Sequence, residues 1–287
     1  MRVSIRSCHG SDAMYFWKAR EMENQFGKVS QLHLTAAPRD GKTIIEDMSF
    51  TAPFKVMRPF YEKKDIMTVM LLTASAGIMA GDRQEFDLHV REGARMEFVS
   101  QAYEKIHKMN EGHAERSTKL VVEHGAALYY TPLPTIPFAQ SDYRSRVEVD
   151  LADETSKFIF TEVLTCGRTA HGEKFAYERF ENLVTIYQAG RIVYRDNTCY
   201  EPARTQMEGF GMYEGFTHLA NLIICNEPRS DAWIGAVREK IDAADRTEGG
   251  VTRTASGHIV VRILGMSGQM LTDQMRQIMK MEDPQDE

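Results

Sequence analysis

Residues 86–98 alternate apolar and polar side chains, which is the pattern of strands that bury one face. Apolar side chains stand at positions 86, 88 and 90, with polar ones between them. A period of two residues is typical of a half-buried strand. Glu92-Gly93-Ala94 interrupts the alternation, and Met96 and Phe98 resume it around Glu97. We therefore predict a strand, a turn and a second strand over this stretch.

The same pattern recurs along the chain. It returns over residues 119–130 with a turn at His124-Gly125, over 147–164 with a turn at 152–155, and over 183–194 with a turn at Ala189-Gly190. An earlier copy surrounds Asp40-Gly41, and successive turns from Gly93 onward lie about 30 to 35 residues apart. This weak repeat predicts a mainly β domain of stacked strand–turn–strand units, either solenoid-like or sandwich-like. A plain antiparallel sandwich is the alternative.

Two helices are predicted in the C-terminal half. Residues 231–242 carry Trp233, Val237 and Ile241 at a spacing of four, and Ser230 or Asp231 can cap the start. Residues 271–281 form the second helix, and 251–264 read as a hairpin that turns at Ser256-Gly257. We predict one domain over residues 26–282, after an N-terminal extension (1–25) and before an acidic tail (283–287).

Composition narrows the class of protein. The 287 residues are 43% hydrophobic and 26% charged, which is ordinary for a folded protein, and the net charge of -6 gives no electrostatic reason to expect nucleic acid binding. Four cysteines without a C-x-x-C pair favour reduced thiols in the cytoplasm. The longest mainly apolar run, residues 66–81, is shorter than the ~20 residues of a membrane helix. We therefore expect a soluble, cytoplasmic protein with no membrane partner.

Motifs that carry catalysis or bind a cofactor are missing from the sequence. It has no G-x-S-x-G elbow, no G-x-x-x-x-G-K-[ST] loop and no H-E-x-x-H. Cys166 and His171 lack a second pair that would complete a zinc site. These observations favour a protein that is not an enzyme.

Glu162 is the clearest polar residue in apolar surroundings. On a strand over 158–164 it shares a face with Phe158 and Phe160, and the opposite face is apolar as well. An ionised carboxylate there is costly unless it is paired or hydrated. Two interpretations remain open, a salt bridge to Arg168 or to another arginine, and an internal water-filled functional site.

The sequence contains two further polar clusters. Gln101, Glu104, Lys105 and His107 follow Val99, where an exposed charged loop is the simpler interpretation. Gly81-Asp82-Arg83 has the composition of a polar turn.

Several stretches together resemble one family, the urease accessory proteins of the UreD/UreH type. The matching segments follow the family's order from about residue 30 to 265. They are Phe50–Tyr61, Leu71–Arg83, Gln101–His107, Leu133–Phe138, Glu162–Arg168 and Arg195–Asn197. One departure is Ser75-Ala76-Gly77, where the family often has Gly-Gly before its Gly-Asp-Arg.

The resemblance implies a non-enzymatic chaperone built as a mostly β single domain with added helices. Members bind a helical accessory protein of the UreF type, which recruits a nickel GTPase of the UreG type. This complex docks on apo-urease and assists nickel delivery to its carbamylated-lysine centre. A polar tunnel is the route proposed for nickel in the family, so nickel would bind only transiently, and no tightly bound cofactor is expected.

A path for a divalent cation needs oxygen and imidazole groups that attract the ion and still release it. By position in the matched motifs, Asp82 and Glu162 are candidates to line the tunnel, and Glu104 and His107 have suitable side chains. Arg168 would orient or neutralise Glu162. Lys105 and the 133–138 segment are expected to shape the body.

Two other functions compete with this interpretation. One is a β-sheet hydrolase that uses Asp82 and Glu162 as paired carboxylates, and the other is a purely structural binding module. A glycosidase pair would need carboxyl groups ~5 to 10 Å apart in an open cleft. The aromatic content of only 9% argues against a sugar-binding cleft.

Overall fold

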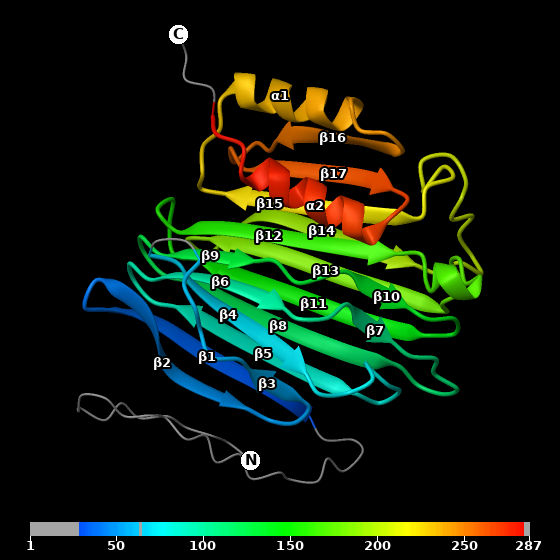
Figure 1. Ribbon diagram of the computed structural model, residues 1–287, viewed down its shortest axis with the longest axis horizontal. Coiled ribbons are helices and arrows are strands. Elements are labelled where there is room, and N and C mark those ends of the chain that lie inside the picture. Colours follow the sequence, from blue (N-terminus) through cyan, green and yellow to red (C-terminus); the bar gives the residue numbers. More distant parts are fainter. Residues whose placement is uncertain (1–28, 63–64, 284–287) are drawn as a thin grey trace.

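The computed structural model describes residues 29–62 and 65–283. The predicted N-terminal extension (1–25) and residues 284–287 of the predicted tail lie outside the described residues. Two β-sheets are stacked face to face, and two helices cover the outer face of one sheet (Figure 1). The prediction of a mainly β single domain with two helices in the C-terminal half is confirmed.

The first sheet, sheet A, has the strand order β14-β13-β11-β8-β5-β1-β2. Its strands in chain order are β1 (Val29–Arg39), β2 (Lys42–Phe50), β5 (Arg83–Val90), β8 (Ala114–Val122), β11 (Asp142–Leu151), β13 (Arg179–Gln188) and β14 (Arg191–Tyr200). Strands β1, β5, β8, β11 and β13 run parallel, and an antiparallel strand closes each edge.

The second sheet, sheet B, has the order β16-β17-β15-β12-β9-β6-β4-β3. Its strands are β3 (Phe54–Val56), β4 (Met67–Thr73), β6 (Arg95–Ser100), β9 (Ala127–Tyr130), β12 (Lys157–Thr165), β15 (His218–Cys225), β16 (Thr247–Arg253) and β17 (Ile259–Gly265). Short strands β7 (Glu104–Ile106) and β10 (Thr135–Pro137) pair beside β12. A 3-10 turn spans Thr169–His171.

Three of the predicted strand–turn–strand units cross from sheet A to sheet B. They are β5–β6, β8–β9 and β11–β12, and equivalent strands of successive units pair in parallel. Their turns stack as well, because Ala127 N donates to Ala94 O (2.9 Å) and Lys157 N donates to Ala126 O (2.8 Å). The centre of the molecule is therefore solenoid-like, and the alternative of a plain antiparallel sandwich is wrong for these strands.

Turn chemistry distinguishes these units from true hairpins. At Asp40-Gly41 and Ala189-Gly190 both residues have positive φ, as a type I′ turn requires, and the chain folds back within sheet A. At Gly93 and Gly125 the residue before the glycine does not have positive φ. The chain there leaves sheet A and enters sheet B.

The core between the sheets is apolar and rich in aromatic rings. Phe98, Tyr130 and Phe160 stand in register on β6, β9 and β12, and successive ring centroids lie 5.3 and 5.9 Å apart in nearly parallel planes. Such a ladder arises because stacked units place equivalent side chains one above another. It forms part of the wall of the cavity described below.

Helices α1 (Asp231–Asp242) and α2 (Gly268–Met279) pack on the outer face of sheet B (Figure 1). The predicted apolar face of α1 is buried, and Trp233 is 0% exposed. Ser230 caps α1, and its N–H and hydroxyl donate to the carboxylate of Asp283. The described part of the chain contains no helix long and apolar enough to cross a membrane.

Candidate functional site

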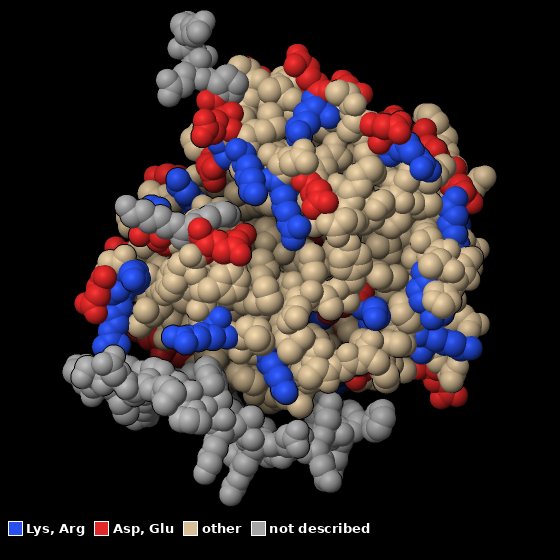
Figure 2. Space-filling view, in the orientation of Figure 1, with Lys and Arg blue, Asp and Glu red and all other residues tan. Residues whose placement is uncertain are grey.

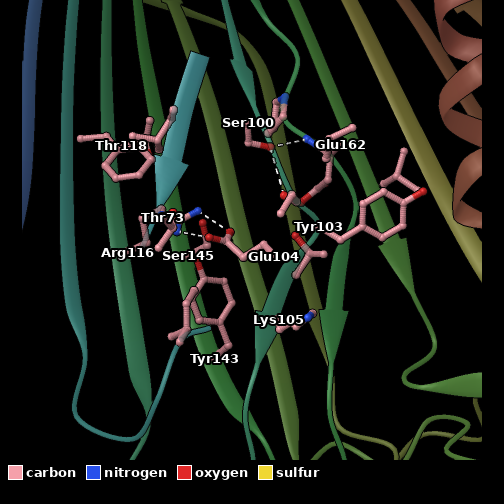
Figure 3. Close-up of a pocket in the computed structure, with 18 of the residues that line it drawn as sticks. Thr73, Ser100, Tyr103, Glu104, Lys105, Arg116, Thr118, Tyr143, Ser145 and Glu162 are labelled. Carbon is pink, nitrogen blue, oxygen red and sulfur yellow. Dashed lines mark hydrogen bonds and ion pairs between the residues drawn. The ribbon is translucent and has the colours of Figure 1, made fainter. Parts of the chain in front are cut away.

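A cavity of about 150 Å³ lies between the two sheets, beyond the aromatic core (Figure 3). Sheet A contributes wall residues from β5, β8, β11 and β13, and sheet B contributes them from β4, β6, β9 and β12. The loop at residues 75–78, the segment at 102–105 and the segment at 132–135 complete the wall. Two of the predicted carboxylates, Glu104 and Glu162, line the cavity.

Glu162 lies on β12 with its side chain on the same side as Phe158 and Phe160, facing sheet A. Asn182 of β13 donates Nδ2–H to Glu162 Oε1 (2.6 Å), and Asn221 of β15 donates Nδ2–H to Oε2 (3.2 Å). The carboxylate forms no ion pair within the part of the chain that the structure describes. Of the two interpretations of the sequence, the structure favours the polar cavity over a salt bridge.

The charge of Glu162 is costly in this position. Burial raises its pKa to about 7, and nearby Asp196 also raises it, whereas the two asparagine donors and Arg262 lower it. Asn221 Oδ1 accepts from Arg262 Nε (2.9 Å), and Arg262 forms an ion pair with Asp196 on β14. A chain of polar contacts therefore joins Glu162 to partly exposed groups on β14, the edge strand of sheet A, and on β17, which lies beside the edge strand of sheet B.

Arg168 is not the charge partner of Glu162. Its guanidinium pairs with Glu173 and lies 4.0 Å from the centroid of the Phe138 ring. β12 continues for only three residues beyond Glu162, to Thr165, and the chain leaves the strand before it reaches Arg168. Gly167, with a φ of +133°, turns the chain away after β12. The expected pairing of Glu162 with Arg168 is thus corrected.

Glu104 has a cationic partner inside the cavity. Both of its carboxylate oxygens accept hydrogen bonds from the guanidinium of Arg116 on β8 (Figure 3). Arg116 also donates Nε–H to Gln84 Oε1 (2.9 Å) and lies 4.6 Å from the centroid of the Phe86 ring. The two cavity carboxylates therefore differ, because an arginine neutralises Glu104, whereas the hydrogen bonds that Glu162 accepts from the described residues come from the amides of Asn182 and Asn221.

Asp82 and His107 are not among the residues that line the cavity. Asp82 Oδ2 accepts from Met79 N (2.8 Å), which fits the polar turn considered from the sequence. His107 Nε2 lies 3.0 Å from Ala76 O, and its ring packs on Phe138. The structure does not bring Asp82 and Glu162 to one cleft, as the paired-carboxylate hydrolase requires.

Oxygen atoms predominate among the atoms with which the cavity could coordinate a cation. Asn182 is 4% exposed, and its Oδ1, buried beside Glu162, has no hydrogen-bond partner among the residues that the structure describes. Ser100, Thr118 and Ser145 add hydroxyl groups to the wall. Across residues 29–62 and 65–283, no three His, Cys, Asp or Glu side chains converge to hold a metal ion. Carboxylate and carbonyl oxygens are among the ligands that divalent cations accept.

Lys105 and part of the 133–138 segment, which were expected to shape the body, line the cavity. Lys105, Leu133 and Thr135 line the wall, and β7 pairs with β10 next to it. Gly77 has a φ of +146°, and a Cβ there would lie 2.4 Å from Lys105 O. Only glycine therefore fits where this loop crosses β7.

Sequence reasoning missed Arg116, Asn182 and Asn221. Arg116 shares its strand face with buried Ala114 and Thr118, and Asn182 shares its face with buried Phe180 and Val184. Glu162 was identified as a polar residue that alternation places on an apolar strand face, and the same rule would have found Arg116 and Asn182. It missed them because the predicted strands began at residues 119 and 183, after these two positions.

Charged side chains are interspersed on the molecular face seen in Figure 2. Most of them lie toward its margins, acidic beside basic, with uncharged residues over much of the centre. This face presents no broad basic surface of the kind that binds a nucleic acid backbone.

Known proteins match nearly the whole described chain. The family model described as "UreD urease accessory protein" matches residues 28–285. Urease accessory protein UreD of Acetivibrio thermocellus is 38% identical over 261 residues, which cover 91% of this chain and 98% of that protein. Urease accessory protein UreH of Helicobacter pylori strain G27 is 35% identical over 249 residues, which cover 86% of this chain and 92% of that protein.

Proposed function

The chain belongs to the UreD family of urease accessory proteins, and on that premise we propose that it serves urease maturation by helping to insert nickel into apo-urease. Its part is that of a scaffold or chaperone rather than an enzyme. The names of its relatives support this, since they are called accessory proteins of urease and not ureases. The separation of Asp82 from the cavity argues in the same direction.

The proposed working state is a complex in the cytoplasm. In it the chain binds a helical accessory protein of the UreF type, a nickel GTPase of the UreG type joins, and the assembly docks on apo-urease. Nickel is cargo that passes through and not a resident cofactor. The oxygen-rich donor set of the cavity supports this, because Glu162 and the Asn182 carbonyl oxygen supply too few ligands to retain the ion.

The position of Glu162 carries the proposal. It is the cavity carboxylate without a cationic partner among the described residues, and amide donors hold it facing the space between the sheets. A hydrated cation entering that space gains the attraction of a charge whose burial is otherwise unfavourable. We therefore expect the passage of nickel through the cavity to depend on the negative charge of Glu162.

Glu162→Gln tests the proposal because it keeps the size and removes the charge. Urease is co-expressed with all accessory proteins, and the yield of the accessory complex and the nickel per urease are measured in one preparation. We expect a normal yield of complex with severalfold less nickel per urease. Glu148→Gln removes an equal charge from the exposed outer face of β11 and is the matched control. Reduced yield with normal nickel per urease would leave Glu162 a structural residue.

A further inference from the structure

Arg116 poses a problem for a cavity that passes cations. Its side chain is 11% exposed, yet it places a permanent positive charge between the sheets, against the cavity wall. Burial lowers its pKa, but attraction by Glu104 outweighs this effect and the pKa is raised, so the guanidinium stays charged. Like charges a few ångströms apart in a protein interior repel by several kcal/mol. The cavity therefore opposes a second cation near Arg116.

The hydrogen bonds of Arg116 occupy most of the hydrogen-bonding capacity of Arg116 and of Glu104. Its guanidinium binds Glu104 in the bidentate manner and uses both carboxylate oxygens. The remaining contacts go to Gln84, which accepts from Nε and from a terminal nitrogen. Arg116 thus has little donor capacity left for an anion, and Glu104 has little acceptor capacity left for a cation.

The backbone around Glu104 is fixed on both sides. Glu104 N donates to Pro134 O (2.9 Å), and β7 forms a parallel ladder with β10. On the other side Ile78 N donates to Lys105 O (2.8 Å). Release of Glu104 must therefore come from movement of side chains and not from displacement of β7.

Gln84 offers the guanidinium a second anchor. Gln84 lies on β5, and its side-chain oxygen accepts two of the guanidinium N–H groups. Phe86 on the same strand packs against the guanidinium, whose central carbon lies 4.6 Å from the ring centroid. Arg116 can keep these contacts after it releases Glu104. The structure shows the arrangement bound to both Glu104 and Gln84, and release of Glu104 would leave an arrangement bound to Gln84 alone.

From this geometry we propose that Arg116 is a cation gate: it occupies Glu104 until a divalent cation displaces it, which keeps the cavity closed to monovalent ions. The inference rests on the proposed function, since it concerns the same cavity. A divalent ion supplies two positive charges to Glu104 where Arg116 supplies one, so it can compete where a singly charged ion cannot. Gln84 is the positioning residue that retains the displaced guanidinium.

Arg116→Met tests the gate in the full-length chain. Removing the arginine leaves Glu104 without charge compensation, so the variant is expected to unfold at a lower temperature than the wild type. Ni²⁺ should then restore much of that loss, and calorimetric titration should show Ni²⁺ binding at least tenfold tighter than in the wild type. K⁺ at equal ionic strength should restore little.

Glu104→Gln combined with Arg116→Met is the matched control, because it removes the uncompensated charge while keeping the opened space. Ni²⁺ should give no gain there. If Arg116→Met folds too poorly to measure, Arg116→Lys keeps the charge without the bidentate geometry and should bind Ni²⁺ more tightly than the wild type. The gate is refuted if the folded single variants bind Ni²⁺ no better than the wild type, or if the double variant binds it equally well.

These measurements separate the gate from the proposed function. Binding of Ni²⁺ by the isolated chain reports on Arg116, whereas nickel per urease with Glu162→Gln reports on delivery. If Arg116→Met binds Ni²⁺ more tightly and Glu162→Gln delivers a normal amount of nickel, the gate is upheld as a property of the cavity and the delivery route is rejected. If Arg116→Met binds Ni²⁺ no more tightly and Glu162→Gln delivers less nickel, the gate alone is rejected.

Discussion

Asn182 donates its Nδ2–H to Glu162 Oε1 across 2.6 Å, and this hydrogen bond joins β13 of sheet A to β12 of sheet B. The bond bridges the two sheets where the ladder of aromatic rings ends and the polar cavity begins. It holds the carboxylate in place while the buried Oδ1 of Asn182 is left without a partner. The hydrogen bond therefore links the position of the Glu162 carboxylate to the packing of the two sheets.

The pH dependence of stability should reveal the buried carboxylate. Burial raises the pKa of Glu162 to about 7 in the folded protein, above the ~4.3 expected when unfolded. The folded state therefore binds the proton more tightly, and stability falls as pH rises between those two values. Glu162→Gln removes this loss, so the variant should gain on the order of 3 kcal/mol relative to wild type between pH 4 and pH 8.

Urea unfolding at both pH values measures that gain, with Glu148→Gln as a control that should show none. The quantity to compare is how the stability difference between Glu162→Gln and the wild type changes with pH. The difference at a single pH is not sufficient, because the substitution also alters one amide contact at every pH. A difference that stays constant from pH 4 to pH 8 would mean that Glu162 titrates like an exposed side chain.

Asn182→Ala should destabilise the protein more at pH 8 than at pH 5. Its amide lowers the pKa of Glu162 by donating to the carboxylate, so its loss raises that pKa further and penalises the ionised form. The cost of losing a hydrogen bond to a buried charged group is about 1 to 3 kcal/mol. The same substitution in the Glu162→Gln background completes a double-mutant cycle, and the pH dependence should disappear there.

Two arginine variants distinguish the pairing seen in the structure from the one expected from the sequence. Arg262→Met removes the donor to Asn221 and a charge that lowers the pKa of Glu162, so the midpoint of the pH-dependent loss of stability should move to higher pH. Arg168→Met should leave that midpoint unchanged, because Arg168 pairs with Glu173. A shift caused by Arg168→Met and not by Arg262→Met would contradict the structure.

Gly77→Ala should strongly reduce the yield of folded protein. The new Cβ would lie 2.4 Å from Lys105 O, which is backbone and cannot give way without moving β7. Strained backbone alone costs about 1 to 3 kcal/mol, and the clash adds to it. Gly81→Ala is the matched control, since Gly81 also has positive φ but nothing lies within 4 Å of its Cβ. Thermal unfolding of both variants should show the larger loss at Gly77.

Local patterns predicted most of the elements. Alternation over residues 86–98 found β5 and β6, and the spacing of Trp233, Val237 and Ile241 found the buried face of α1. These predictions succeeded because period and capping depend on residues near one another in the chain. The choice between hairpin and crossover was harder, since it depended on whether the residue before a glycine adopts positive φ, as Asp40 does.

The sequence by itself determined the β class, the two helices and the polar character of Glu162, because each follows from side chains a few residues apart. The tertiary structure alone decided the partners. Glu162 meets Asn182 and Asn221, and Glu104 meets Arg116, through the register of strands in different units. Arg168 is nearer in sequence, but the chain leaves β12 after Thr165 and Arg168 pairs with Glu173 instead. A buried charge takes the partner that register and sheet packing bring within hydrogen-bond distance, and neither is encoded in local spacing.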